Sequence, residues 1–230
     1  MGDFIRNLDW TILLGVIPAL LCITIHELAH GYTAYRLGDM TAKNMGRLTL
    51  NPIKHIDIFG LLMMVFMRFG WAKPVPVNMR NFKKPRLHMA ITALAGPLSN
   101  IVLAVIVFFF LGLLIAPLGG FFSPIDGQIY VAEGAGKIAI ELIYRAAMLS
   151  VALAVFNILP IPPLDGSKVL FSFLPEQTYY KLMRYERFGM IILILLVFQQ
   201  TIFSATVGGA TFTLVDLFAG ITRFAYNLVN

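Results

Sequence analysis

The chain has 230 residues, of which 58% are hydrophobic and 13% charged, with a formal net charge of +6. Soluble domains carry about 25% charged residues, so this composition excludes an ordinary soluble protein and predicts a polytopic membrane protein. Nucleic acid is not the expected partner, because the basic residues are concentrated in two segments, 36–86 and 166–187.

The first apolar run, residues 11–36, is long enough to span a membrane and contains His26-Glu27-Leu28-Ala29-His30. In a helix, positions i and i+4 lie about 40° apart around the axis, so both imidazoles would project from one face. Two neutral imidazoles at this spacing suit Zn²⁺, and Glu27 between them is placed to act as a general base. Ionisable groups at membrane depth are costly, which favours a functional site over histidines that only form hydrogen bonds in a polar interior.

Further apolar runs predict an all-α bundle of four to six transmembrane helices in one membrane-embedded domain, 1–230, with its core at 11–170. Because Lys and Arg mark cytoplasmic loops, the basic segments are expected in the cytoplasm and residues 117–136 outside. The cytoplasmic charges would contact anionic lipid of the bilayer. The later runs are 87–116, 137–160 and 188–207, and a weaker one at 210–229 after a turn at Gly208-Gly209.

Two unusual segments lie between the first and second runs. Residues 57–70 are short for a crossing and have basic flanks, so they are expected to dip into the membrane from the cytoplasmic side. The following segment, Lys73-Pro74-Val75-Pro76-Val77-Asn78, excludes a helix and favours a membrane-re-entrant β segment with a free edge. Such backbone persists at membrane depth only where protein buries it or a wet cavity adjoins it. The alternative is an ordinary proline-rich loop.

A catalytic zinc needs three protein ligands, so a third must join the two histidines. Asp165 is favoured, because prolines break the third long run just before it and its predicted depth matches that of the histidines. A helix N-cap role for Asp165 is the alternative. The other candidates are His55, His88, Asp57 and Asp216.

The HExxH motif, together with Asn157-x-x-Pro160-x-x-Pro163-x-Asp165-Gly166, resembles the site-2 protease family of intramembrane zinc metalloproteases, peptidase family M50. The resemblance spans roughly residues 20–170. It is greatest to the compact prokaryotic members without a PDZ domain, because no insertion here could hold one. Further agreement comes from Gly38-Asp39, from 51–57, from the Pro-Val-Pro-Val-Asn segment and from 95–100.

The resemblance implies that His26, His30 and Asp165 ligate one Zn²⁺ and that Glu27 is the catalytic acid and base. Asn157 would hold the substrate or the developing oxyanion. The implied activity is cleavage of single-pass membrane proteins within or near their transmembrane segments. The implied location is the cell membrane, with the site toward the cytoplasm.

Segment 73–78 would then pair with an unwound substrate by β-augmentation. His55 and Asn100 are candidates for orienting a zinc ligand from behind, and Gly96 and Gly112 are expected to permit close helix packing. The rival interpretation is a membrane metal carrier that uses the same His and Asp residues without hydrolysis. A scaffold with a structural zinc is a third. Glu27 argues against the carrier, because a carrier needs ligands but no spare base between them.

Overall fold

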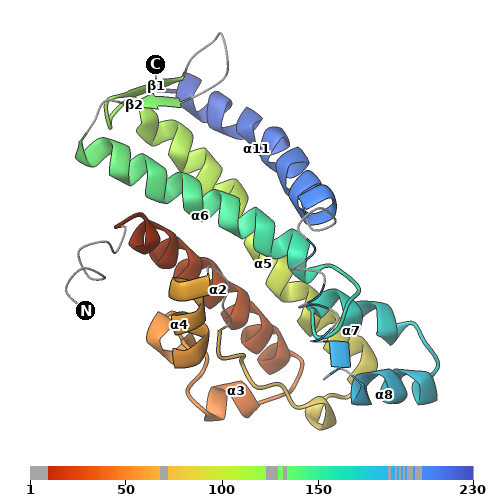
Figure 1. Ribbon diagram of the computed structural model, residues 1–230. Coiled ribbons are helices and arrows are strands. Elements are labelled where there is room, and N and C mark those ends of the chain that lie inside the picture. Colours follow the sequence, from red (N-terminus) through yellow and green to blue (C-terminus); the bar gives the residue numbers. More distant parts are fainter. Residues whose placement is uncertain are drawn as a thin grey trace.

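The computed structural model describes residues 10–67, 72–122, 129–131, 134–185, 188–189, 191, 193, 195, 199 and 204–229. Most of this part of the chain is helical, and its one sheet has two short antiparallel strands (Figure 1). The long helices are α2 (Trp10–Arg36), α5 (Pro85–Ile115), α6 (Ala135–Asn157) and α11 (Gly209–Asn227). The strands are β1 (Gly120–Phe122) and β2 (Ile129–Val131).

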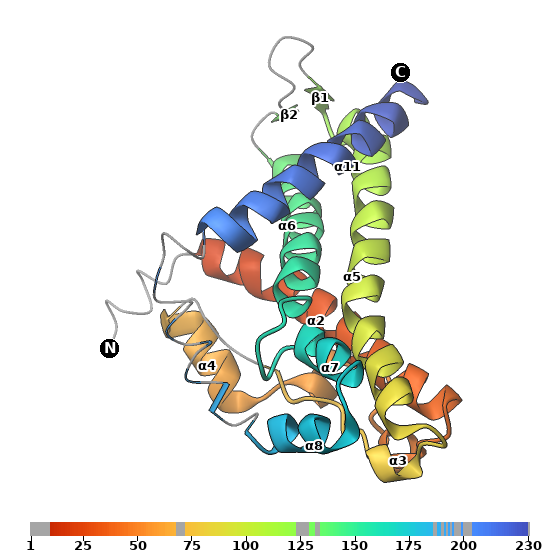
Figure 2. The ribbon, with the colours of Figure 1, turned by 90° about the vertical axis from the view of Figure 1, so that its right-hand side faces the viewer.

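Shorter helices connect the long ones. Three of them, α3, α7 and α8, gather at the end of the molecule opposite the β1–β2 sheet (Figures 1 and 2). The short elements are α3 (Thr41–Asn44), η1 (Pro52–His55), α4 (Ile58–Met67), η2 (Met79–Asn81), α7 (Asp165–Ser172), α8 (Glu176–Arg184) and the π-helix η3 (Ser204–Gly208).

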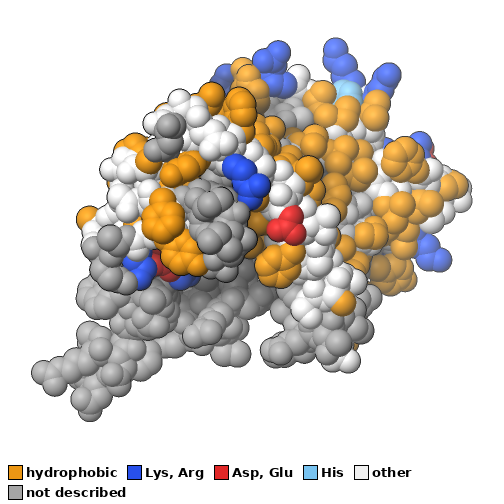
Figure 3. Space-filling view, turned by 90° about the horizontal axis from the view of Figure 1, so that it is seen from above, with side chains coloured by type: hydrophobic (Ala, Val, Ile, Leu, Met, Phe, Trp, Pro, Cys, Tyr) orange, Lys and Arg blue, Asp and Glu red, His pale blue; other side chains and the backbone are white. Residues whose placement is uncertain are grey.

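Three helices of the described chain are long and apolar enough to cross a membrane: α5, α6 and the continuous Ser204–Asn227. With its 27 residues, α2 is about 40 Å long and of comparable reach. Hydrophobic side chains cover much of the described surface seen from the sheet end (Figure 3). The prediction of an all-α membrane protein is therefore confirmed.

Helix α5 is the centre of the bundle and packs against α2, α6, α7 and α11. At Gly112 a Cβ atom would lie 2.2 Å from the carbonyl oxygen of Thr222, so the glycine lets α11 lie directly on α5, as the sequence predicted. The hydroxyl of Thr222 donates to the carbonyl of Phe108 across the same contact. The core of buried apolar residues around it includes Phe108, Leu111, Ile115, Ile140, Val151, Val215 and Phe218.

One expectation about the path of the chain needs correction here. The turn predicted at Gly208-Gly209 is wrong, because Gly208 has helical dihedral angles (φ −61°, ψ −52°) and η3 continues directly into α11. A helix tolerates glycine at a cost of about 1 kcal/mol, so the pair did not have to end one. Half of the predicted crossing at 188–207 lies outside the described residues. Segment 57–70 is a helix, α4, as far as the structure describes it.

The segment 73–78 forms neither helix nor ladder in the structure. The edge strand expected there is reduced to one isolated antiparallel bridge beside it, between Ile56 and Ala72. Asn78 at its far end is nevertheless extended, with φ −110° and ψ 104°. The backbone groups of segment 73–78 therefore form their hydrogen bonds outside a sheet.

Candidate metal centre

The two motif histidines lie one helical turn apart on the buried face of α2. Their exposed fractions are 7% for His26 and 9% for His30, and their ring centroids are 4.6 Å apart with the planes at 88°. A helix places residues i and i+4 on one face, so the sequence spacing alone produces this pair.

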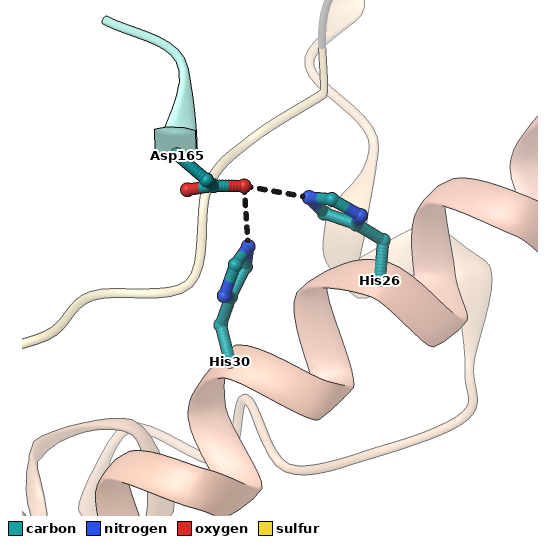
Figure 4. A group of neighbouring side chains, drawn as sticks. All are labelled: His26, His30 and Asp165. Atoms are coloured by element: carbon teal, nitrogen blue, oxygen red, sulfur yellow. Dashed lines mark hydrogen bonds and ion pairs between the residues drawn. The ribbon is translucent and has the colours of Figure 1, made fainter. Parts of the chain in front are cut away.

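Asp165 joins them from the other side of the site. One of its carboxylate oxygens, Oδ2, lies 3.1 Å from Nε2 of His26 and 3.1 Å from Nε2 of His30 (Figure 4). All three ligand atoms lie within 4.8 Å of one another, and all three residues are buried. The structure therefore brings together the three residues that the resemblance assigned to zinc.

The break between α6 and α7 positions this carboxylate. Asp165 is the first residue of α7, and the N-cap position belongs to Leu164, with no side-chain cap bond. The N-cap interpretation of Asp165 is therefore wrong. At Gly166 a Cβ atom would lie 2.0 Å from the carbonyl oxygen of Ile158, so only glycine allows α7 to begin against the end of α6. The glycine after the acid thus fixes where the acid points.

The donor set fits zinc. Two imidazole nitrogens and one carboxylate oxygen are three ligands that Zn²⁺ accepts, and a catalytic site keeps its fourth position for water or substrate. The carboxylate of Asp165 turns one oxygen, Oδ2, toward the two imidazoles. Lys168 Nζ lies 3.5 Å from its other oxygen.

The nitrogen of each imidazole that faces away from the centre has a partner on α5. Nδ1 of His30 lies 2.7 Å from the carbonyl oxygen of Thr92, a group that only accepts. Nδ1 therefore carries the hydrogen and Nε2 keeps its lone pair for a metal. Nδ1 of His26 lies 3.3 Å from the amide of Asn100, as expected for a residue that orients a ligand.

The Asn100 amide has two orientations related by a half-turn. With its NH₂ group toward His26, its oxygen is buried without a partner among the described residues. The reversed amide pairs that oxygen with Nδ1–H of His26 and leaves Nε2 of His26 free for the metal. Both imidazoles then present the same nitrogen to the centre.

Gly96 on α5 lies against both imidazoles. A Cβ atom there would lie 2.4 Å from Nε2 of His30 and 2.6 Å from Cε1 of His26. The sequence predicted only close helix packing at this glycine. In the structure the absent side chain is what leaves room for the two ligands.

Glu27 is half-buried and its carboxylate faces the 73–78 segment. Its Oε2 accepts a 2.7 Å hydrogen bond from the backbone N–H of Val75. The other oxygen has no hydrogen bond among the described residues. The general base predicted from the motif is therefore held at one oxygen and available at the other.

Two other predicted residues lie differently. Asn157, at the end of α6, donates its side-chain amide to the carbonyl of Leu153 in its own helix. His55 is buried, contacts the carbonyl of Thr49 through Nε2, and accepts the N–H of Lys73 at its own carbonyl. Asn157 thus points along α6, and His55 supports the start of the 73–78 segment and does not belong to the metal group.

Sequence reasoning missed what holds the 73–78 segment in place. Asp39 accepts hydrogen bonds from Asn78 and Asn81, and Arg47 donates to the carbonyl oxygens at the start of the segment. In the sequence, Asp39 stands out only as part of the Gly38-Asp39 pair, and Arg47 only as one of many basic residues. Their burial was the missing signal, and no local pattern contains it.

Known proteins resemble this chain in sequence. The sequence pattern that defines Peptidase family M50 matches residues 14–203. A protein of Bacillus subtilis (strain 168) named "Putative zinc metalloprotease YwhC" is 43% identical over 181 residues, covering 79% of this chain and 78% of that protein. The "Putative zinc metalloprotease Rip2" of Mycolicibacterium smegmatis is 30% identical, covering 85% of this chain and 71% of that protein. No solved structure matches the chain.

The family pattern extends over most of the chain and includes the helix with the motif, the break before α7 and Asp165. The metal group in the structure consists of the residues that the family resemblance assigned to zinc. The chain belongs to Peptidase family M50 and is a zinc metalloprotease.

Proposed function

We propose that this metalloprotease is of the site-2 type and hydrolyses peptide bonds within or near the transmembrane segments of single-pass membrane proteins. The observation that carries the proposal is that the metal group lies on a membrane-length helix. Residues 15–25 of α2 lead into His26 without a charged side chain. A site built there meets substrates inside the bilayer.

The chemistry follows from the arrangement of the side chains. A zinc ion held by His26, His30 and Asp165 would act as a Lewis acid and lower the pKa of a coordinated water to about 7. The oxygen of Glu27 that Val75 does not hold would accept a proton from the attacking water and return it to the leaving amine. Asn157 would reach a substrate carbonyl only after its amide turns away from Leu153.

We further propose that the site faces the cytoplasm and that the protein lies in the cell membrane, in contact with anionic lipid. The support is the distribution of charge. Among the described lysines and arginines, only Lys137, Arg145 and Arg223 lie outside segments 36–86 and 168–184. These two segments carry α3, α7 and α8, at the end opposite the sheet (Figure 1). Excess Lys and Arg mark the cytoplasmic side.

The decisive experiment compares the wild-type protein with Glu27→Gln in cells that also produce candidate single-pass proteins. Gln keeps the size of the side chain but does not take up a proton, so uncut substrate should accumulate with the variant alone. Zinc content of the purified variant should match the wild-type protein. Equal cleavage by both proteins would remove Glu27 from the mechanism, and loss of zinc would make it a ligand.

The zinc assignment has its own control. His30→Ala removes one of three ligands, so the purified variant should contain much less zinc than the wild-type protein. Equal zinc content in the two proteins would disprove the ligand set.

A metal carrier remains the competing function, and the same variant separates the two. Transport through the His and Asp ligands does not need a proton acceptor at position 27. In proteoliposomes loaded with a fluorescent zinc indicator, we expect no zinc influx for the wild-type protein. Influx that persists in Glu27→Gln, with no cleavage by the wild-type protein, would favour the carrier.

A further inference from the structure

Segment 73–78 lies directly on the helix that carries the metal ligands. At Gly31, next to His30, a Cβ atom would lie 2.8 Å from Cγ1 of Val75, so a side chain there would push the segment away. Val75 is buried at this contact. The N–H of Val75 donates to Glu27. One residue of the segment thus contacts the helix by its side chain and the general base by its backbone.

Two buried charges hold the segment on either side of Val75. Arg47, only 7% exposed, donates from one guanidinium nitrogen to the carbonyl oxygens of Lys73 and Pro74, at 2.8 and 3.3 Å. Asp39, fully buried, accepts the N–H of Asn78 at 2.6 Å. Arg47 therefore fixes the chain before Val75, and Asp39 fixes it after.

Buried charges are costly unless hydrogen bonds compensate them, and surface loops rarely contain them. Asp39 has four such bonds, from the backbone and hydroxyl of Thr41, from Asn78 and from Asn81. No carboxylate within 4 Å pairs with Arg47 in the part of the chain that the structure describes. Its guanidinium instead donates to the backbone carbonyls of one short segment. Such an arrangement fixes the position of that segment.

Resting on the proteolytic function proposed above, we propose that Asp39 and Arg47 are positioning residues that hold Val75 N–H against Glu27. A carboxylate that is fixed at one oxygen holds its other oxygen in a constant direction. A general base needs this, because it must stay within hydrogen-bond reach of the water that it deprotonates. The segment is then part of the apparatus that aims the base. This role differs from substrate docking, which the same segment was expected to perform.

The two roles predict different kinetics. A residue that orients the base acts in the chemical step, so its loss lowers kcat and leaves KM nearly unchanged. A segment that only binds substrate acts on KM. The variants are Asp39→Asn and Arg47→Gln, which remove one charge each at similar size, and Arg47→Lys, which keeps the charge but offers a single nitrogen.

For Asp39→Asn and Arg47→Gln we expect kcat to fall about tenfold or more, with KM within about twofold and zinc content unchanged. Arg47→Lys should regain part of the loss. The matched controls are Arg36→Gln, an exposed arginine at the end of α2, and Asp57→Asn, whose carboxylate caps α4; both should retain wild-type kinetics. Unchanged kcat in both test variants, or a change confined to KM, would overturn the proposal.

A backbone substitution covers the case in which a charge variant does not fold. Val75→Pro removes the N–H donor together with the valine side chain, in a segment that already has proline on both sides. Val75→Ala removes the side-chain packing but keeps the N–H. We expect a kcat for Val75→Pro well below that of Val75→Ala, and equal values would overturn the proposal.

Hydrogen exchange provides a test that does not depend on cleavage. Backbone amides of 73–82 should exchange faster in Asp39→Asn and Arg47→Gln than in the wild-type protein, and at the wild-type rate in Asp57→Asn. Equal exchange in all four proteins would disprove that Asp39 and Arg47 hold the segment. If the wild-type protein cleaves nothing in a Glu27-dependent way, the proposed function fails, while the exchange rates still decide whether the two charges hold the segment.

Discussion

At the scale of single residues, Asn100 is the side chain on which the geometry of His26 depends. His30 is oriented by a backbone carbonyl, which no substitution of Thr92 removes. His26 has only the side-chain amide of Asn100 at the corresponding nitrogen. The two metal ligands therefore differ in how easily mutation disturbs them.

We predict that Asn100→Ala lowers zinc affinity about 10- to 100-fold, because His26 loses the partner that fixes its ring and its tautomer. Asn100→Asp, which still accepts Nδ1–H, should remain closer to the wild-type protein. Competition with a chromophoric chelator measures both affinities. Thr24→Ala, a buried hydroxyl on α2 with no described partner, is the control. Wild-type zinc affinity in Asn100→Ala would show that His26 needs no partner.

Asp39 predicts a dependence of stability on pH. Burial raises its pKa, but hydrogen bonds from Thr41, Asn78 and Asn81 outweigh this effect and hold the pKa below its usual value. A depressed pKa in the folded state adds stability above the unfolded pKa of about 3.9, and this stability is lost as the pH falls through the lower folded pKa.

The midpoint of thermal unfolding in detergent should therefore fall for the wild-type protein as the pH decreases from about 5 to about 3. In Asp39→Asn, which does not titrate at this position, the fall should be smaller. A series of melting curves at fixed salt measures it. Identical pH profiles for the two proteins would mean that Asp39 contributes nothing to the acid dependence.

Residue identities close to the chemistry could be predicted from the sequence, and their orientations could not. HExxH specifies two ligands because the helix repeat is regular, and the prolines before Asp165 reveal a break in a helix. The direction of Asn157 depends on a competing carbonyl one turn earlier in α6, and sequence spacing says nothing about that competition.

At the scale of elements, the close approach of α5 to α2 is the contact on which the metal group depends. Gly96 allows it, because a methyl group there would lie 2.4 Å from Nε2 of His30, the atom that faces the metal. Overpacking of this kind costs about 1–3 kcal/mol, roughly 5- to 150-fold in an equilibrium constant.

We therefore predict that Gly96→Ala reduces zinc affinity by about tenfold or more. Gly220→Ala is the matched control, because Gly220 is also helical and no atom lies within 4 Å of the position that its methyl group would take. It should bind zinc like the wild-type protein. The chelator competition used for Asn100 applies here as well, and unaltered affinity in Gly96→Ala would show that α5 shifts without disturbing the ligands.

For the 73–78 segment, the sequence pattern predicted only part of the structure. Alternating Pro and Val correctly excluded a helix, but a strand would repeat every two residues. The N–H groups of Val75 and Asn78, three residues apart, both donate to carboxylates. Three residues is the repeat of polyproline II, which Pro74 and Pro76 favour. The partners come from distant parts of the chain, so no local pattern could identify them.

At the scale of the whole molecule, hydropathy located the helices better than it located the reversals between them. The predicted runs 87–116 and 137–160 correspond to α5 and α6. The C-terminal part was divided at a glycine pair, whereas the structure has one continuous helix from Ser204 to Asn227. Apolar composition indicates contact with lipid, and a glycine pair indicates conformational freedom. Neither of them requires the chain to turn.

The orientation in the membrane decides which compartment supplies water to the site, and labelling of single cysteines measures it. Cys22 is buried, and Cys22→Ser provides a parent without thiols. Two variants of this parent would each carry a single cysteine, Phe121→Cys in β1 or Lys84→Cys before α5. Both positions are exposed, and they lie at opposite ends of the molecule.

A maleimide that does not cross membranes should label Phe121→Cys on intact cells and Lys84→Cys only after the membrane is opened. The reason is that basic loops remain on the cytoplasmic side, and Lys84 lies in the most basic segment of the chain. The Cys22→Ser parent, which has no thiol, is the control for background labelling. The reverse labelling pattern would place the ends of α2 and α7 that form the metal group toward the outside, and the substrates would then have to be cut from that face.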